Sequence, residues 1–250
     1  MKAIFYLRSI LMTIIFFVVT VFFSICGVLN FLIFDHRKLH DLIISSWARC
    51  SCFIFNVTVV IHNPENKPKA GTVFLFNHSS FFDIFALAGV IPEVRFGAKT
   101  ELFKIPLFGS AMKSAGTLPI ARGSRDEVFK VYSEARIRVQ QNEKFALAPE
   151  GGRFYGENLS PFKSGPFIFA ITSGAIISPI IITGAYEVLP KKKFLANTDR
   201  WHRQIDLYFL KPHAVDGLTI ESRQDLQKMI YDQMNAKWTE SNQNLTTSQL

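Results

Sequence analysis

The chain has 250 residues, of which 48% are hydrophobic and 19% are charged, so it can form one sizeable domain with an appendage and is too apolar to be disordered. Its formal net charge of +8 favours anionic partners: nucleic acid, acidic lipid surfaces or phosphorylated small molecules. The three cysteines, Cys26, Cys50 and Cys52, match neither a structural zinc site nor a disulfide framework, and we interpret them as small apolar residues.

The first predicted element is an apolar run, Ser9–Phe34, that contains no charged residue. It is longer than the ~20 residues that a helix needs to cross the hydrocarbon of a bilayer. A cleaved signal peptide is the alternative, but its apolar region would be shorter, and no A-x-A cleavage pattern is present. We therefore predict a membrane-associated helix. Basic residues flank both ends of the run, so their charge does not settle the orientation of the helix in the membrane.

The second predicted helix covers Leu39–Phe55. Its apolar side chains recur at helical spacing on one face, while polar side chains lie away from that stripe. After a membrane run, such a stripe fits a core-facing helix and a membrane-surface helix equally well, and Trp47 and Arg49 would suit the interface. The stripe consists of Leu39, Leu42, Ile43, Trp47, Cys50, Phe53 and Ile54, and the polar positions are His40, Asp41, Ser45 and Arg49.

From residue 57 onward, short apolar runs alternate with helical stretches, which is typical of an α/β domain. We predict a largely parallel mixed sheet flanked by helices, preceded by the membrane-associated helical segment. The predicted organisation is residues 1–56 for the amino-terminal helices, 57–240 for the α/β domain and 241–250 for a polar tail. The expected strands are 57–61, 73–76, 94–98, 118–121, 145–148, 176–183 and 205–210, and the expected helices are 82–90, 105–114, 126–141, 166–173 and 222–238.

The stretch FNHSSFFD places polar residues in an apolar neighbourhood directly after the predicted strand 73–76, where sites of parallel sheets gather. His78 and Asp83 are five residues apart, so on one regular helix they would differ by about 140° around the axis. They can meet only if His78 precedes the helix and Asp83 lies in its first turn, with Ser79 or Ser80 as the helix cap. A carboxylate beside an imidazole would then support general-base catalysis by the histidine.

Simpler explanations exist for this stretch. An isolated H-x-x-x-x-D is more often a capped turn with a hydrogen-bonded histidine. A metal site is not expected, because two ligands are too few and the other histidines show no ligand spacing. A serine hydrolase is not indicated, because the G-x-S-x-G pattern is absent.

Two further stretches carry arginines at predicted strand ends. GTLPIAR ends on Arg122, whose guanidinium could grip a phosphate or could be an ordinary surface group. In LAPEGGRF the glycines permit a tight turn from which Glu150 and Arg153 project. Glu150 could bind a substrate hydroxyl or a cationic side chain, Arg153 could bind phosphate, or the two could form a purely structural pair.

The last stretch, ISPII, places Pro179 inside an apolar strand. Proline removes one hydrogen bond of the strand ladder, so we expect an edge strand or a strand end, with a structural role.

Taken in this order, these stretches resemble the glycerolipid acyltransferase family, which includes the 1-acylglycerol-3-phosphate acyltransferases. The resemblance covers about residues 57–183, and the segment KTELFKIPLFG, which begins at Lys99, also looks like the family's. Departures from the family's pattern occur in the third block, with Ala148, Gly152 and Phe154 where phenylalanine, threonine and serine are usual. The matching positions are Asn77, His78, Ser80 and Asp83 in the first block, Arg122 in the second, Glu150, Gly151 and Arg153 in the third, and Pro179 in the fourth.

The resemblance implies transfer of an acyl chain from acyl-CoA or acyl carrier protein to the hydroxyl of lysophosphatidic acid, without a metal or other cofactor. It assigns catalysis to His78 and Asp83 and binding of the acceptor phosphate to Arg122 and Arg153. A cell-membrane location with the catalytic domain facing the cytoplasm is expected, with membrane lipid as a partner and no nucleic acid. Two alternatives stay open: another lyso-lipid acceptor, such as a lyso-ornithine lipid or lysophosphatidylethanolamine, and a non-catalytic lipid-binding protein.

Overall fold

The structure is a computed structural model that describes residues 2–68, 71–121 and 125–247. These residues group into two compact units that alternate along the chain. Unit 1 consists of Met1–Val59, Ser80–Arg125 and Gly184–Ile205, and unit 2 consists of Val60–Ser79, Asp126–Thr183 and Asp206–Leu250.

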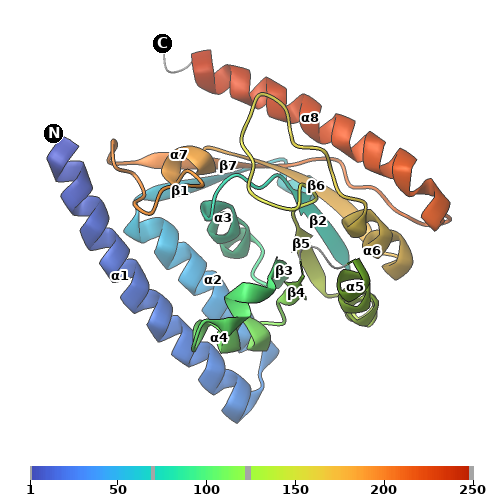
Figure 1. The fold of residues 1–250 in the computed structure, drawn as a ribbon, viewed down its shortest axis with the longest axis horizontal. Coiled ribbons are helices and arrows are strands. Elements are labelled where there is room, and N and C mark those ends of the chain that lie inside the picture. The colour runs from blue at the N-terminus through green and yellow to red at the C-terminus, as the bar shows by residue number, and fades with distance from the viewer. Residues whose placement is uncertain (1, 69–70, 122–124, 248–250) are drawn as a thin grey trace. The chain divides into compact units, whose positions relative to one another are not determined.

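Unit 1 is mainly helical, and its strands β3 and β4 pair in parallel with Gly97 opposite Leu118. Helix α3 begins at Phe82 and ends at Val90, as predicted, and six of its nine residues are buried. The remaining elements of the unit are α1 (Lys2–Leu29), η1 (Asn30–Phe34), α2 (Arg37–Ile54), β3 (Val94–Lys99), η3 (Thr100–Lys104), α4 (Phe108–Ser114), β4 (Leu118–Ile120) and α7 (Ala185–Val188) (Figure 1).

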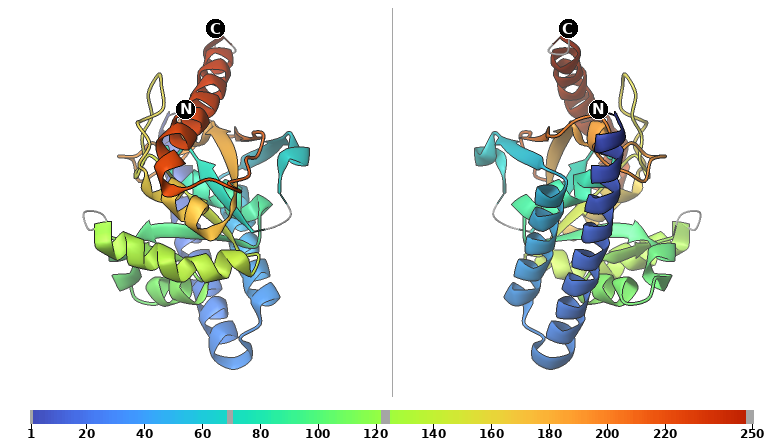
Figure 2. Two further views of the ribbon diagram at one scale, coloured as in Figure 1. Left: turned by 90° about the vertical axis from the view of Figure 1, so that its right-hand side faces the viewer. Right: turned by 90° about the vertical axis from the view of Figure 1, so that its left-hand side faces the viewer.

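Helices α1 and α2 lie side by side as an antiparallel hairpin (Figure 2). The buried residues of α1 are Ser9, Ser24 and Gly27, whereas its isoleucine, leucine, valine and phenylalanine side chains are largely exposed. By length and composition, the segment Lys2–Phe34 can cross a membrane, and 11% of its most apolar window is buried. The burial pattern of α1 is therefore the reverse of the pattern in a water-soluble helix.

Helix α2 shows the same reversal. Among the stripe residues, Leu42 is 59% exposed and Phe53 is 85% exposed, while His40 and Ser45 from the polar face are buried. A purely core-facing stripe is therefore excluded. Trp47 is partly exposed, and its ring packs edge-on against Phe85 within unit 1.

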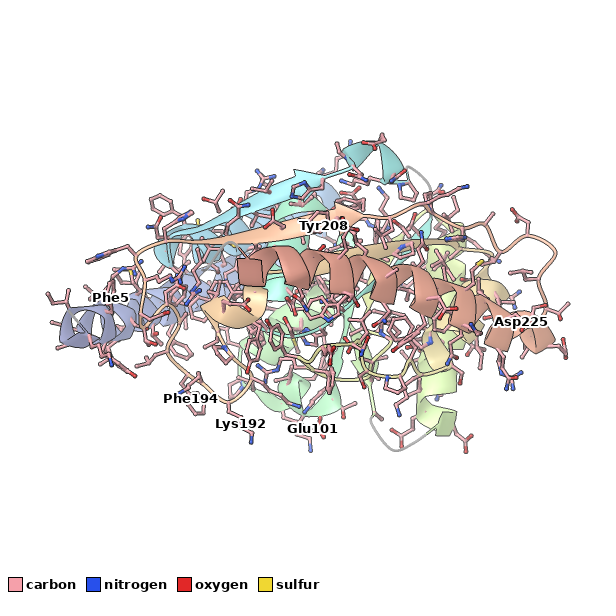
Figure 3. The ribbon with its side chains drawn as sticks, turned by 90° about the horizontal axis from the view of Figure 1, so that it is seen from above. Phe5, Glu101, Lys192, Phe194, Tyr208 and Asp225 are labelled. Carbon is pink, nitrogen blue, oxygen red and sulfur yellow. The ribbon has the colours of Figure 1, made fainter. Side chains whose placement is uncertain are left out.

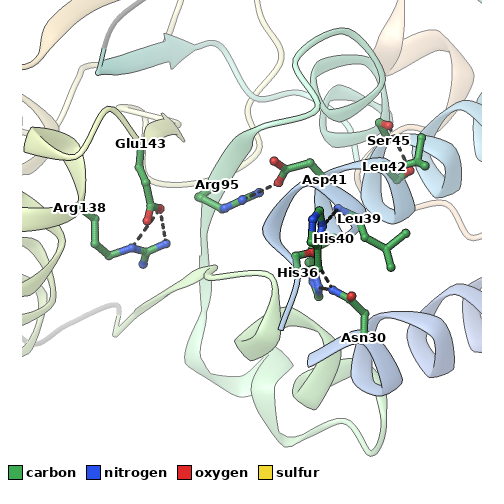
Figure 4. Close-up of polar contacts among 10 residues, drawn as sticks. All are labelled: Asn30, His36, Leu39, His40, Asp41, Leu42, Ser45, Arg95, Arg138 and Glu143. Carbon is green, nitrogen blue, oxygen red and sulfur yellow. Dashed lines mark hydrogen bonds and ion pairs between the residues drawn. The ribbon is translucent and has the colours of Figure 1, made fainter. Parts of the chain in front are cut away.

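Polar contacts hold the hairpin together and fix it to the rest of unit 1 (Figure 4). At the turn, the Asn30 side-chain amide donates to the carbonyl oxygen of His36 at 3.1 Å and lies 3.3 Å from Nδ1 of His40. Farther along, the buried Arg95 of β3 forms an ion pair with Asp41 of α2, with 2.5 Å between nitrogen and oxygen. Removing either partner would leave an unpaired charge in a largely buried position, which is costly.

Unit 2 contains most of the sheet and its hydrophobic core. Strand β2 pairs in parallel with β5 on one side and with β6 on the other, while β7 pairs antiparallel to β6. All five residues of β2 are buried, which is typical of a central parallel strand. The elements are β1 (Val57–His62), η2 (Pro64–Asn66), β2 (Thr72–Phe76), α5 (Arg125–Gln140), β5 (Lys144–Leu147), α6 (Gly165–Ser173), β6 (Ile176–Thr183), β7 (Arg203–Phe209), η4 (Ile220–Ser222) and α8 (Arg223–Thr247). Strands β1 and β7 are each divided between the units, and the first residue of α5 belongs to unit 1.

The predicted fold class is confirmed: the protein is α/β, with mixed, mostly parallel strand pairing, flanking helices and an apolar amino-terminal helix. Several details differ from the prediction, and three of them follow. The helix expected at 105–114 begins only at Phe108, after Leu107 with a φ of 62°. Helix α7 was not among the predicted helices. Helix α8 continues to Thr247 instead of ending at Trp238. The domain boundaries at 56/57 and 240/241 stay a prediction.

The expectation that Pro179 lies at a sheet edge or strand end is wrong. Pro179 is buried inside β6 and lies opposite Leu75 of β2 in the parallel register. On its other side the antiparallel pairing slips by one residue, because Ile180 pairs with Phe209 but Ile177 pairs with His213. The proline therefore lies at a bulge, where the ladder is interrupted and its missing N–H costs little.

Candidate active site

In unit 2, the first predicted motif begins where β2 ends. The side chain of Asn77, which is 2% exposed, forms two hydrogen bonds with the backbone of Ile182 in β6. Its amide donates to the carbonyl oxygen at 2.9 Å, and its oxygen accepts from the N–H at 2.7 Å. The asparagine side chain thus pairs with β6 as another strand residue would, and it fixes the point at which His78 leaves the sheet.

The loop that follows β5 holds the backbone of His78 on both sides. The His78 N–H donates to Oε1 of Glu150 at 2.8 Å, and the His78 carbonyl oxygen accepts from the N–H of Phe154 at 2.7 Å. Its imidazole lies edge-on to the ring of Phe76, with 5.6 Å between the ring centroids, and is partly exposed. The first and third predicted blocks therefore meet at His78, although they are far apart in the sequence.

Glu150 organises this loop. Its second oxygen, Oε2, accepts from the N–H of Ser160 at 3.0 Å, and the residue is 8% exposed. Both carboxylate oxygens thus bind backbone amides of this chain, which the sequence did not reveal because the two partners lie on different segments. Binding of a substrate hydroxyl by Glu150 stays a prediction.

The glycine predicted to permit a tight turn does so. Gly151 has a φ of +74°, and its N–H donates to the carbonyl oxygen of Ala148 at 3.0 Å. A left-handed φ of this kind favours glycine over residues with a side chain. Arg153 follows in the same loop and is partly exposed. It lies close to His78 in the chain fold of unit 2, because the next residue, Phe154, is hydrogen-bonded to the backbone of His78.

In unit 1, Asp83 lies in the first turn of α3, as the spacing predicted. It is completely buried, and its Oδ2 accepts from the N–H of Ser80 at 2.8 Å. In return, Oγ of Ser80 accepts from the N–H of Phe82 at 3.2 Å, so the two side chains form a reciprocal cap at the start of the helix. A carboxylate in this position is also favoured by the dipole of the helix.

Two other predicted site residues, Lys99 and Arg122, have no described contact with the loop that holds His78. Lys99 is exposed at the end of β3 in unit 1. Arg122, the predicted phosphate-binding residue, lies outside the described residues. The described residues contain no group of three or more histidine, cysteine, aspartate or glutamate side chains that could hold a metal ion.

The structure thus positions both halves of the H-x-x-x-x-D motif, each within its own unit. His78 belongs to unit 2 and Asp83 to unit 1, so the contact between their side chains stays a prediction. A histidine held by its backbone at a strand end can present its ring for proton transfer, and the third block provides backbone amides and an arginine near it.

Known proteins match the chain in this region. A sequence model of the Acyltransferase family matches residues 58–183, which is just over half of the chain and contains all the predicted motif residues. The chain belongs to the Acyltransferase family.

Several of its relatives in this family are named 1-acyl-sn-glycerol-3-phosphate acyltransferase. A chloroplastic enzyme of Brassica napus is 33% identical over 64% of this chain and 47% of its own length. An enzyme of Haemophilus influenzae is 24% identical over 79% of this chain and 81% of its own. The chain spans about half the length of the chloroplastic relatives that it matches.

The fold is shared with a solved acyltransferase structure. The crystal structure of the 1-acyl-sn-glycerophosphate acyltransferase from Thermotoga maritima superimposes with a TM-score of 0.78, covering 97% of this chain and 98% of that one. At 23% sequence identity, this likeness establishes the common fold.

Proposed function

We propose that this member of the Acyltransferase family transfers an acyl chain from acyl-CoA or acyl carrier protein to the free hydroxyl of lysophosphatidic acid, which yields phosphatidic acid. The names of its relatives support the reaction and the acceptor. The observation that carries the proposal is the meeting of the first and third blocks at His78, whose backbone is held by Glu150 and Phe154.

In this mechanism, Nε2 of His78 removes the proton of the acceptor hydroxyl as its oxygen attacks the thioester carbonyl. Asp83 holds the imidazole and balances the positive charge that it gains. The tetrahedral intermediate then collapses: the C–S bond breaks, and His78 returns the proton to the departing thiolate of the donor, which leaves as a thiol. This direct transfer needs neither a covalent enzyme intermediate nor a metal. Arg122 and Arg153 bind the acceptor phosphate, since guanidinium groups match phosphate oxygens in pairs.

The amino-terminal hairpin would bring this chemistry to its lipid substrate. Its outward apolar side chains and inward polar ones suit an environment of lipid better than one of water. We therefore include membrane association, with the catalytic residues on the cytoplasmic side where acyl-CoA and acyl carrier protein occur.

The test is a thioester-consumption assay on the purified full chain with a panel of lyso-lipids that includes lysophosphatidic acid, lysophosphatidylethanolamine and a lyso-ornithine lipid. We expect lysophosphatidic acid to be preferred. His78→Ala and Asp83→Asn should each lower kcat by ~10²–10⁴, because they remove the base or its orienting partner.

His202→Ala is the matched control, because His202 is an exposed histidine of unit 1. It should leave kcat unchanged. A folded His78→Ala variant with unchanged acyl transfer would refute the catalytic role and favour a lipid-binding protein. A preference for another lyso-lipid would refute the acceptor and leave the catalytic role intact.

A further inference from the structure

The 190–201 loop of unit 1 carries an exposed basic and aromatic tip that the proposed mechanism does not use. Its sequence begins PKKKF, and Lys191, Lys192 and Lys193 are all exposed. Phe194 is 92% exposed, more than any other large hydrophobic side chain of the described residues. Lys192 and Phe194 project away from the ribbon (Figure 3).

The loop is firmly attached to the amino-terminal end of α1. Ser9 donates its hydroxyl to the carbonyl oxygen of Ala196 at 2.6 Å. The Arg8 guanidinium donates to the carbonyl oxygens of Arg200 and Trp201 at 3.1 and 3.0 Å, and it also lies 5.0 Å from the centre of the Trp201 ring. These bonds hold the loop beside the apolar helix.

The neighbourhood of the loop combines positive charge with apolar surface. Trp201 is 55% exposed, and the ring of Phe5 from α1 packs edge-on against it at 5.3 Å. The acidic side chain in the loop, Asp199, is paired with Arg203 at 2.7 Å, so it offsets little of the charge of the three lysines. Lysine, tryptophan and phenylalanine side chains together are typical of a surface that lies at the interface of a membrane.

We propose that the 190–201 loop is a second membrane contact that binds anionic lipid, with Phe194 inserted among the acyl chains and the lysines on the headgroups. This inference rests on the membrane association included in the proposed function and goes beyond it, because it assigns a lipid charge preference to a specific loop. An acidic protein such as a carrier protein could also attract lysines. The 92% exposure of Phe194 and the contact of the loop with Phe5 of the apolar helix α1 favour a lipid surface instead.

The test measures binding of the purified full chain to vesicles of phosphatidylcholine alone and to vesicles that contain 30% phosphatidylglycerol, without acyl donor or acceptor. The variant with Lys191, Lys192 and Lys193 all changed to Gln should bind the anionic vesicles on the order of 100-fold more weakly, since each basic residue near such a surface contributes separately. Its binding to neutral vesicles should change little. Phe194→Ser should weaken binding to both kinds of vesicle about tenfold.

Two controls in unit 2 match these variants. Changing Lys130, Lys211 and Lys228 to Gln removes the same charge from exposed positions, and Ile137→Ser removes an exposed apolar side chain, which is 60% exposed. Both controls should bind like the parent protein. Replacing the three loop lysines by arginine should preserve the preference for anionic vesicles, which separates loss of charge from loss of structure.

The outcomes distinguish this inference from the proposed function. If the loop variants bind vesicles as well as the controls do, the inference is overturned. The proposed acyl-transfer function would still stand, because it does not depend on this loop. Unchanged vesicle binding combined with a loss of activity only when acyl carrier protein is the donor would overturn it in favour of a carrier-protein site. If the parent protein fails to bind vesicles of either kind, both the inference and the proposed membrane association are wrong.

Discussion

The amino-terminal hairpin and strand β2 of unit 2 follow opposite rules of burial. In α1, a glycine and two serines are buried while leucine, isoleucine and phenylalanine side chains are exposed. In β2, every residue is buried, and all are apolar except Thr72 at its start. The comparison shows that an apolar segment avoids water but does not by itself reveal what covers it. In β2 the covering atoms belong to the protein, whereas the apolar side chains of α1 suit contact with lipid.

The largest expected effect is a difference in folding stability between alanine variants of two phenylalanines, one in β2 and one in the hairpin. Phe74 of β2 is fully buried, so Phe74→Ala should lower the free energy of unfolding by about 3–5 kcal/mol, because it leaves a cavity in the core. Phe34 of the hairpin is 67% exposed, and Phe34→Ala should change it by less than about 0.5 kcal/mol. Denaturant unfolding in detergent measures both, and equal losses would show that the hairpin packs as an ordinary protein core.

The next effect concerns the ion pair between the hairpin and β3. Arg95→Ala leaves the Asp41 carboxylate without its partner in a largely buried position, and we expect a loss of about 3 kcal/mol. The double variant Arg95→Met, Asp41→Leu should recover most of this loss, because no lone charge remains. Lys228→Ala, which breaks an exposed pair with Asp232, is the control and should cause no measurable change. If Arg95→Ala matches that control, the pair does not fix the hairpin.

A smaller effect is expected at the loop that holds His78. Glu150→Gln replaces one carboxylate oxygen, which accepts a hydrogen bond from a backbone N–H, by an NH₂ group that cannot accept one. This change should lower the free energy of unfolding by about 1–3 kcal/mol. It should also lower kcat at least tenfold. KM for the acceptor lipid should change less than kcat, since the histidine is displaced and not the phosphate site. Glu157→Gln, at an exposed position of the same loop, should be neutral. Equal changes in KM and kcat would favour a direct binding role for Glu150.

The smallest effect is a pH dependence at the hairpin turn. Burial, helped by the positive charge of Arg95 and opposed by Asp41 and Asp35, lowers the pKa of His40 from 6.5. As the pH falls below 6.5, the unfolded chain binds a proton there that the folded protein resists, so the free energy of unfolding should fall. Thermal unfolding between pH 7.5 and 5.5 should show a shallower decline for His40→Gln than for the parent protein. His202→Gln should keep the parent slope, and a parent slope for His40→Gln as well would refute the assignment.

Prediction from the sequence succeeded where the signal is local. The bounds of α3 and β6 were predicted to the residue, because a helical or strand-like apolar run is bounded there by turn residues. The motif order also predicted the family and the range that it covers. Prediction failed at Pro179, because the bulge depends on how the chain around His213 pairs with β6.

By itself, the sequence determined the order of the strands and the longer helices, the apolar amino-terminal helix and the residues of the four blocks, because each depends on neighbours along the chain. Only the tertiary structure decided which face of α2 is buried, how Asn77 pairs with Ile182, and that Glu150 binds the backbone of His78. These features arise from contacts between segments that are distant in the chain, and no periodicity or spacing within one segment encodes them.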